Sequence, residues 1–206
     1  MPPRTTALAP YKGGAVLAAE TRFERIAFEG QTFQDQAADL VSFLGCALTR
    51  VGFANARLTR VDFTDSVLET CDLANANWEK AHFASVRAAG CRMVGVDLAG
   101  AFFKGCAFED CNASFAQFRE ATFKGTRFRE CNLRGSSFQG ADLRGVSFAG
   151  CDLGEAQMSF ASLGGADFRG AEIQGIRIRI EDVRGLIVDP VQAAYLSGLM
   201  GLKVLP

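Results

Sequence analysis

The chain has 206 residues, with 22 basic side chains against 23 acidic ones and a net charge of −1. Its basic residues are dispersed, which disfavours direct binding to nucleic acid, and no apolar run approaches the roughly 18 residues of a membrane span. The first twenty residues contain Pro2, Pro3 and Pro10 and lack the continuous apolar stretch of a signal peptide. We therefore expect a short lead-in over residues 1–20 and a cytoplasmic protein without a membrane partner.

A large apolar residue recurs at every fifth position from Phe23 onwards, through Phe103 near the middle, to Ile178. A period of five fits neither a helix face, which repeats about every 3.6 residues, nor a strand, which repeats about every two. Such an internal repeat has to be interpreted first, because it decides the fold.

Each unit of five runs from a small residue through a polar one to the large apolar residue, then to a polar residue and often glycine. Clear copies are Cys131–Gly135, Ala141–Gly145 and Ala166–Gly170. Residues 21 to 185 resemble the pentapeptide-repeat family, whose pattern is A(D/N)LXX. The resemblance implies an all-β solenoid, a right-handed quadrilateral β-helix in which four units make one square coil. Stacking at strand spacing then gives about eight coils and a rod on the order of 40 Å long.

In this arrangement the central residue and the small residue two positions before it point inward. All seven cysteines fall at the small inward position: Cys46, Cys71, Cys91, Cys106, Cys111, Cys131 and Cys151. No CxxC spacing occurs, so we expect buried structural thiols in a reducing compartment and no metal or cofactor. The many glycines at the fifth position predict corners with φ > 0.

Three units carry alanine in place of the large central residue: Ala38, Ala88 and Ala113. Each leaves a small gap or lets a neighbouring side chain move in. Phe115 is a candidate to fill the gap beside Ala113, and the alternative is that Phe115 is exposed.

The repeat stops after Val188, where Asp189-Pro190 predicts the start of a helix over residues 190 to 200. Ile187–Ala193, followed by Gly201–Val204, resembles the ending of the Qnr-type quinolone-resistance proteins. The chain thus divides into a lead-in, a β-helix over 21–188 and a capping tail over 189–206. The resemblance implies a homodimer formed by this tail, and the alternative is a helix that only caps its own coil. The implied dimer contacts are Tyr195, Leu196, Leu199 and Met200.

No catalytic motif is present, and the only histidine, His82, falls at an outward position where we expect it to be solvated. A narrow solenoid filled with phenylalanine leaves no cavity for a substrate. The resemblance implies a protein that is not an enzyme. Such a protein binds a bacterial type II topoisomerase, DNA gyrase or topoisomerase IV, and protects it from quinolones or a natural toxin. Mimicry of the DNA rod is one implied mechanism. The alternative is a pentapeptide-repeat scaffold with an unrelated partner.

The five-residue phase never shifts, so no projecting loop is expected to contact the topoisomerase. One face is somewhat richer in acidic and amide side chains, although a solvated mixed surface is the alternative. The candidate contact residues are Asp72, Asp152, Glu155 and Glu172 on that face, and the outward aromatic residues Phe102 and Phe160.

Overall fold

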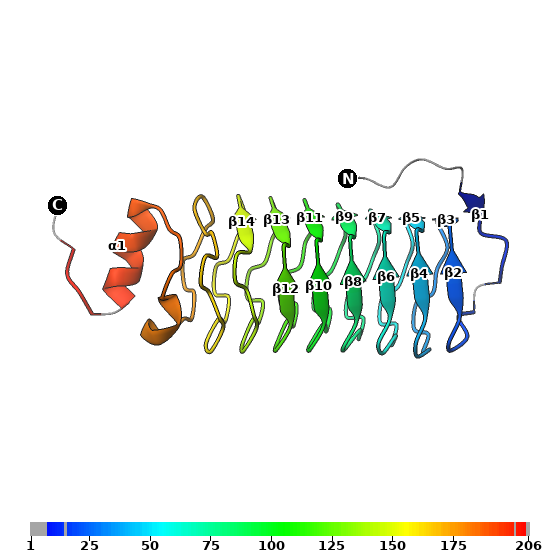
Figure 1. The fold of residues 1–206 in the computed structure, drawn as a ribbon, viewed down its shortest axis with the longest axis horizontal. Helices are drawn as coiled ribbons and strands as arrows, with labels where there is room; N and C mark the ends of the chain where they lie inside the picture. Colours follow the sequence, from blue (N-terminus) through cyan, green and yellow to red (C-terminus); the bar gives the residue numbers. More distant parts are fainter. Residues whose placement is uncertain (1–7, 15, 200, 205–206) are drawn as a thin grey trace.

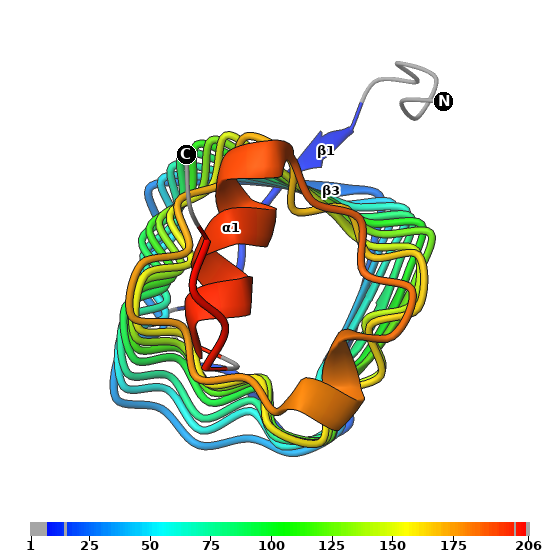
Figure 2. The ribbon, with the colours of Figure 1, turned by 90° about the vertical axis from the view of Figure 1, so that its left-hand side faces the viewer.

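The computed structural model describes residues 8–14, 16–199 and 201–204. It shows a single rod of stacked coils, with β1 (Ala9–Pro10) at one end and α1 (Pro190–Leu199) at the other (Figure 1). Seen from the C-terminal end, the chain turns counterclockwise as it approaches the viewer, so the coil is right-handed (Figure 2). The predicted solenoid is confirmed, with about seven turns in place of eight. The chain leaves the repeat at both ends to form caps, which shortens the regular part.

Two parallel sheets run along the rod. The first has eight strands in the order β1-β3-β5-β7-β9-β11-β13-β14, and the second has six in the order β12-β10-β8-β6-β4-β2. The bounds are β2 Arg22–Glu24, β3 Ile26–Glu29, β4 Ser42–Leu44, β5 Ala47–Thr49, β6 Asp62–Thr64, β7 Val67–Glu69, β8 His82–Ala84, β9 Arg87–Ala89, β10 Phe102–Lys104, β11 Ala107–Glu109, β12 Thr122–Lys124, β13 Arg127–Arg129 and β14 Ser147–Ala149. A 3₁₀ helix at Ile180–Val183 forms the last corner.

Residues in register on neighbouring coils are twenty positions apart. Phe83 pairs with Phe103, and Phe103 pairs with Phe123. The other two sides of the rod are joined by single parallel bridges with the same spacing, from Thr32–Gly52 to Gln157–Arg177. Because the spacing is constant, no loop is inserted between the coils over this range, as predicted.

The large central residues fill the interior and stack on their counterparts one coil away. Phe43 and Phe63 have ring centroids 4.6 Å apart with an interplanar angle of 4°, and Phe103 and Phe123 repeat both values. Trp78 is fully buried within this column structure, and its Nε1 finds no hydrogen-bond partner among the described residues. Since burying one such side chain is worth roughly 1.5–3 kcal/mol, the aromatic columns are the main source of stability.

The corners of the coil confirm the expected backbone conformation. Every fifth residue from Glu20 to Gly175 has a positive φ, whether it is glycine or not. Gly135 shows a second reason for glycine at this position. The ring of Phe115, one coil earlier, lies only 2.7 Å from where a Cβ on Gly135 would stand. A side chain at a corner can therefore contact the corresponding corner of the next coil.

The cysteines are all buried and free, as predicted. Cys71 Sγ lies 3.3 Å from the carbonyl oxygen of Leu48 on the preceding coil and 3.6 Å from that of Glu69. Ser66 donates from its hydroxyl to the corresponding carbonyls of Phe43 and Thr64. These side chains thus satisfy backbone acceptors at the corners. Burial raises the pKa of the Cys106 thiol, which keeps it protonated as such a donor requires.

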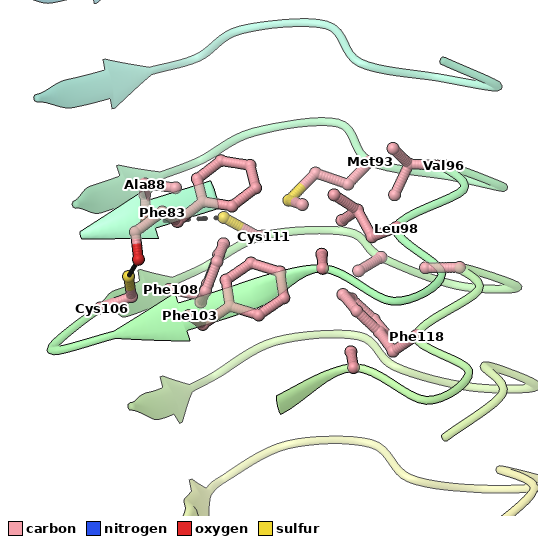
Figure 3. Packing of buried hydrophobic residues seen from close by; sticks show 14 of the residues in the cluster. Phe83, Ala88, Met93, Val96, Leu98, Phe103, Cys106, Phe108, Cys111 and Phe118 are labelled. Carbon is pink, nitrogen blue, oxygen red and sulfur yellow. Dashed lines mark hydrogen bonds between the residues drawn. The ribbon is translucent and has the colours of Figure 1, made fainter. Parts of the chain in front are cut away.

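The gap expected at Ala88 is almost closed by its neighbours. A cavity of about 10 Å³ remains, lined in part by Phe83, Met93 and Phe108 (Figure 3). This volume is at the lower limit for one water molecule, so neighbouring side chains have moved in. At Ala113 the proposed filling by Phe115 is wrong, because the Phe115 side chain is 59% exposed. Its position at a corner directs it away from the interior.

The lead-in caps the open N-terminal coil, a role that the sequence did not predict. β1 pairs with β3, and the ring of Tyr11 stacks on Phe28 with centroids 4.6 Å apart. Leu17 is buried, and its N–H donates to Oε1 of Gln36 at 2.7 Å. The first aromatic coil is thereby covered on its outer side.

Candidate interaction surfaces

The C-terminal helix begins as predicted, with a reciprocal cap. Asp189 Oδ1 accepts from the N–H of Gln192 at 3.0 Å, while Gln192 Oε1 accepts from the N–H of Asp189 at 3.0 Å. This is a capping box. The bond from the Gln192 N–H is also the main cause that lowers the pKa of the Asp189 carboxyl. Gln192 Nε2 then donates to the carbonyls of Phe168 at 2.6 Å and Ala171 at 2.7 Å, which fixes the helix to the last coil.

Replacing Gln192 by leucine is expected to lower the free energy of unfolding by about 2–4 kcal/mol, because two buried carbonyls and the Asp189 N–H each lose a hydrogen bond. Guanidinium unfolding followed by circular dichroism measures the loss. Val191→Ala is the matched control, since Val191 is 79% exposed and a change of less than about 0.5 kcal/mol is expected there. Equal losses in the two variants would contradict the view that the hydrogen bonds of Gln192 hold α1 on the last coil.

The residues proposed for a dimer contact divide into two groups. Leu196 is buried against the last coil, and the Tyr195 hydroxyl accepts from the N–H of Gly175 at 2.7 Å. These two residues cap their own coil. Leu199 is 51% exposed, and Met200 lies outside the described residues. On α1 and in the described residues after it, the exposed large apolar side chains are Val191, Leu199, Leu202 and Val204.

A pocket of about 540 Å³ lies between α1 and the last coil. Ala171, Ile173 and Val191 form its apolar part, and Glu172 and Gln192 are among its polar residues. Seen along the rod, α1 lies across the end of the last coil (Figure 2).

The acidic and amide face exists as a continuous column. Bridges connect Asp72 to Arg92 and continue through Asn112 and Asn132 to Asp152, then to Glu172. Arginine side chains in and beside this column nevertheless compensate part of its negative charge. Arg92 Nη1 lies 3.1 Å from both carboxylate oxygens of Asp72.

The second part of this face is neutralised only in part, because one arginine faces two carboxylates. Arg134 binds Glu155 and lies 4.0 Å from Asp152. Glu172 Oε1 accepts from the N–H of Gln174 at 2.8 Å. Exposed ion pairs of this kind add little stability, but they cancel much of the field that would attract a basic groove.

Phe102 is half-buried in an array of side chains along β6, β8 and β10. Its ring stacks on His82 with centroids 5.6 Å apart and an angle of 2°, and Lys124 Nζ lies 5.6 Å from the ring centroid. His82 Nδ1 lies 2.8 Å from Asp62 Oδ2. The prediction that His82 is only solvated is therefore wrong, because twenty-residue spacing places a carboxylate on one side of it and an aromatic ring on the other.

Phe160 is 68% exposed at a corner near the C-terminal end. The Arg179 guanidinium lies over its ring at 4.1 Å, and the N–H of Phe160 donates to Asp182 Oδ2 at 2.8 Å. Phe160 thus has partners within the chain. The sequence left open whether Phe115 is exposed and did not indicate it as a contact residue, although a bulky residue at a fifth position, where glycine is frequent, was a usable signal.

In residues 8–14, 16–199 and 201–204, no group of three or more histidine, cysteine or acidic side chains is placed to hold a metal ion. Within the same ranges, no helix has the length and apolar character needed to cross a membrane. The interior is filled with packed side chains. The chemistry that this geometry offers is contact through the outer surface and through the two ends.

The fold and these surfaces define a pentapeptide-repeat β-solenoid, a filled rod with a short C-terminal helix. Residues 81–158 match the family model described as a pentapeptide repeat region, and the resemblance seen in the sequence is thereby confirmed. A search of curated protein sequences finds no match.

Solved structures show the same architecture. HetL is a pentapeptide repeat protein involved in heterocyst differentiation regulation from the cyanobacterium Nostoc sp. strain PCC 7120. It is 16% identical over 86% of this chain and 90% of its own, with a TM-score of 0.54. QnrB1, a plasmid-mediated fluoroquinolone resistance protein, is 23% identical over 91% of both chains, with a TM-score of 0.48. A pentapeptide repeat protein from the Arabidopsis thaliana thylakoid lumen is 25% identical over 52% of this chain and 77% of its own, with a TM-score of 0.31. At these identities the similarity to HetL establishes the fold and nothing further.

Proposed function

We propose that this chain binds a bacterial type II topoisomerase, chiefly DNA gyrase, and protects it from quinolones or a natural-product toxin. The chain acts without catalysis, by contact through its surface. A bound protein of this kind can change the outcome only through different affinities for the states of the enzyme. The rod binds the drug-trapped cleavage complex and biases it toward release of the poison.

The observation that carries this proposal is the C-terminal ending joined to an unbroken rod. The segment Ile187–Ala193, whose sequence resembles the Qnr-type ending, contains the reciprocal bonds of Asp189 and Gln192. Gln192 also fixes that ending to the last coil. The constant twenty-residue register supports a contact made by the rod itself.

The test is a supercoiling and DNA-cleavage assay with purified DNA gyrase, with and without ciprofloxacin. Micromolar amounts of the folded chain are expected to restore supercoiling in the presence of the drug and to reduce cleaved DNA. Heat-unfolded chain at the same concentration is the control. If the folded chain neither alters supercoiling nor relieves the drug, the proposal fails.

We also propose that two copies associate through their C-terminal ends. The apolar side chains of Leu199, Leu202 and Val204 are available there, each more than half exposed. Two such ends facing each other remove this apolar area from water.

The double variant Leu199→Arg with Leu202→Arg is expected to halve the mass measured by sedimentation equilibrium, because like charges then meet across the contact. Val16→Arg is a control at the opposite end of the rod, since Val16 is 80% exposed and no change of mass is expected. A double variant that keeps the mass of the unaltered chain would rule out this contact.

A scaffold with an unrelated protein partner is the second candidate function. The pairing of Asp72 with Arg92, and of Asp152 and Glu155 with Arg134, favours it, because a DNA mimic requires uncompensated negative charge. The gyrase assay separates the two candidates, since a scaffold of this kind leaves supercoiling and drug sensitivity unchanged.

A further inference from the structure

Phe115 occupies a position that neither the backbone nor the core requires to be aromatic. Its φ of +58° lies in the left-handed region, as at every corner of the coil, and Phe160 at its own corner has a φ of +66°. Its side chain is 59% exposed, about halfway along the rod.

The neighbouring corners make Phe115 stand out from the surface. Gly95 and Gly135 occupy the equivalent corners one coil before and one coil after it, and neither carries a side chain. The Phe115 ring lies against Gly135. Among the described residues, no other ring and no cation stacks on it. Phe102 and Phe160, by contrast, are each covered by a cation within the chain.

The surface around Phe115 is polar but carries little net charge. Asn112 and Asn132 are exposed on the adjacent column, and their Oδ1 atoms accept from the N–H groups of Ser114 at 3.2 Å and Arg134 at 3.0 Å. The amide Nδ2 groups are then the donors offered to a partner. Further along the face, Asp72 is paired with Arg92 in one direction, and Asp152 and Glu155 share Arg134 in the other.

The surface has an exposed aromatic residue surrounded by amide side chains and by charges that are paired. This composition is typical of the centre of a protein interface with its polar rim. We propose that Phe115, Asn112 and Asn132, here called the Phe115 surface, form the centre of the contact with the topoisomerase. This inference rests on the proposed function. Phe115 enters an apolar socket on the enzyme, and the two amides donate to acceptors at its edge. The contact is driven by apolar burial and hydrogen bonds, in contrast to a DNA mimic, which acts through negative charge.

The test compares the binding of purified DNA gyrase to the unaltered chain, to Phe115→Asn and to Phe160→Asn at about 0.05 and 0.3 M salt. Asparagine adopts a positive φ readily, so both variants keep the corner, and the emission of buried Trp78 verifies the fold. Phe115→Asn is expected to weaken binding at least about tenfold, as for an interface hot spot. Phe160→Asn is expected to change it less than about twofold. Affinity is expected to fall less than about threefold between the two salt concentrations, because paired charges contribute little that salt can screen.

Four results would overturn the inference. Equal binding by Phe115→Asn and the unaltered chain removes Phe115 from the contact while leaving the proposed function intact. Steep salt dependence, together with loss of binding in an Asp152→Lys, Glu155→Lys variant, identifies an electrostatic contact in its place. If the unaltered chain does not bind gyrase, the proposed function and this partner fail together. A lower mass of Phe115→Asn in sedimentation would instead identify the Phe115 surface as a contact between copies of this chain.

Discussion

Replacing Phe103 by alanine is expected to lower the free energy of unfolding by about 3–5 kcal/mol, the usual range for a buried aromatic residue. Phe103 is fully buried, and its ring stacks on Phe83 at 4.9 Å and on Phe123 at 4.6 Å. The change therefore breaks an aromatic column in the middle of the rod and leaves a cavity. Because each coil contacts only its neighbours, distant parts of the chain cannot move in to fill it.

Guanidinium unfolding followed by the fluorescence of Trp78, the single tryptophan, measures this loss. Phe102→Ala is the matched control, since the same side chain is removed from the adjacent residue, which is only half-buried. A loss of less than about 1.5 kcal/mol is expected there, because the stack with His82 and the contact with Lys124 are partly solvated. A Phe103→Ala loss no larger than that of Phe102→Ala would contradict the view that the inner columns carry the stability.

The architecture was predictable because it is encoded locally and repeatedly. The residue at the third position of each unit is buried from Phe28 to Ile173, and the fifth position has a positive φ from Glu20 to Gly175. No long-range information is needed to recognise such a pattern. The C-terminal helix was predictable for a related reason. Asp189 and Pro190 mark the start of a helix, and both lie within its first turn, so no distant residue is needed to recognise them.

The surface was less predictable, because it depends on pairs that are distant in sequence. His82 meets Asp62 and Phe102 through the twenty-residue register, so sorting outward residues by that register would have found the array. Arg134, however, reaches Glu155 at a neighbouring corner, and the register alone does not specify that choice. The exposure of Phe115 is set by the backbone direction at the corner. This direction places the side chain outside, even though its own unit has alanine at its centre.

The N-terminal cap was missed because it lies outside the repeat: Ala9 pairs with Ile26 and Pro10 with Ala27, a spacing of seventeen. The N–H groups of Ala9 and Tyr11 donate to the carbonyls of Arg25 and Ala27. Since donors alternate along a strand, the nitrogen of Pro10 faces the free edge, where proline has no hydrogen to offer. An edge strand with proline at this position resists pairing with another chain.

Deleting residues 1–13 is therefore expected to make the chain associate through its N-terminal end. The deletion uncovers Phe28, on which Tyr11 stacks, and frees the carbonyls of Arg25 and Ala27 at the edge of β3. Sedimentation velocity over a range of concentrations should show a mass that rises beyond that of full-length Lys12→Ala, which keeps the strand and the Tyr11 ring. Because α1 covers the other end, contact between N-terminal ends alone stops at pairs. If the C-terminal contact also forms, the truncated chain grows into long assemblies, and adding Leu199→Arg with Leu202→Arg returns it to pairs. A truncated chain whose mass stays constant with concentration would show that β1 and Tyr11 are not needed to block this edge.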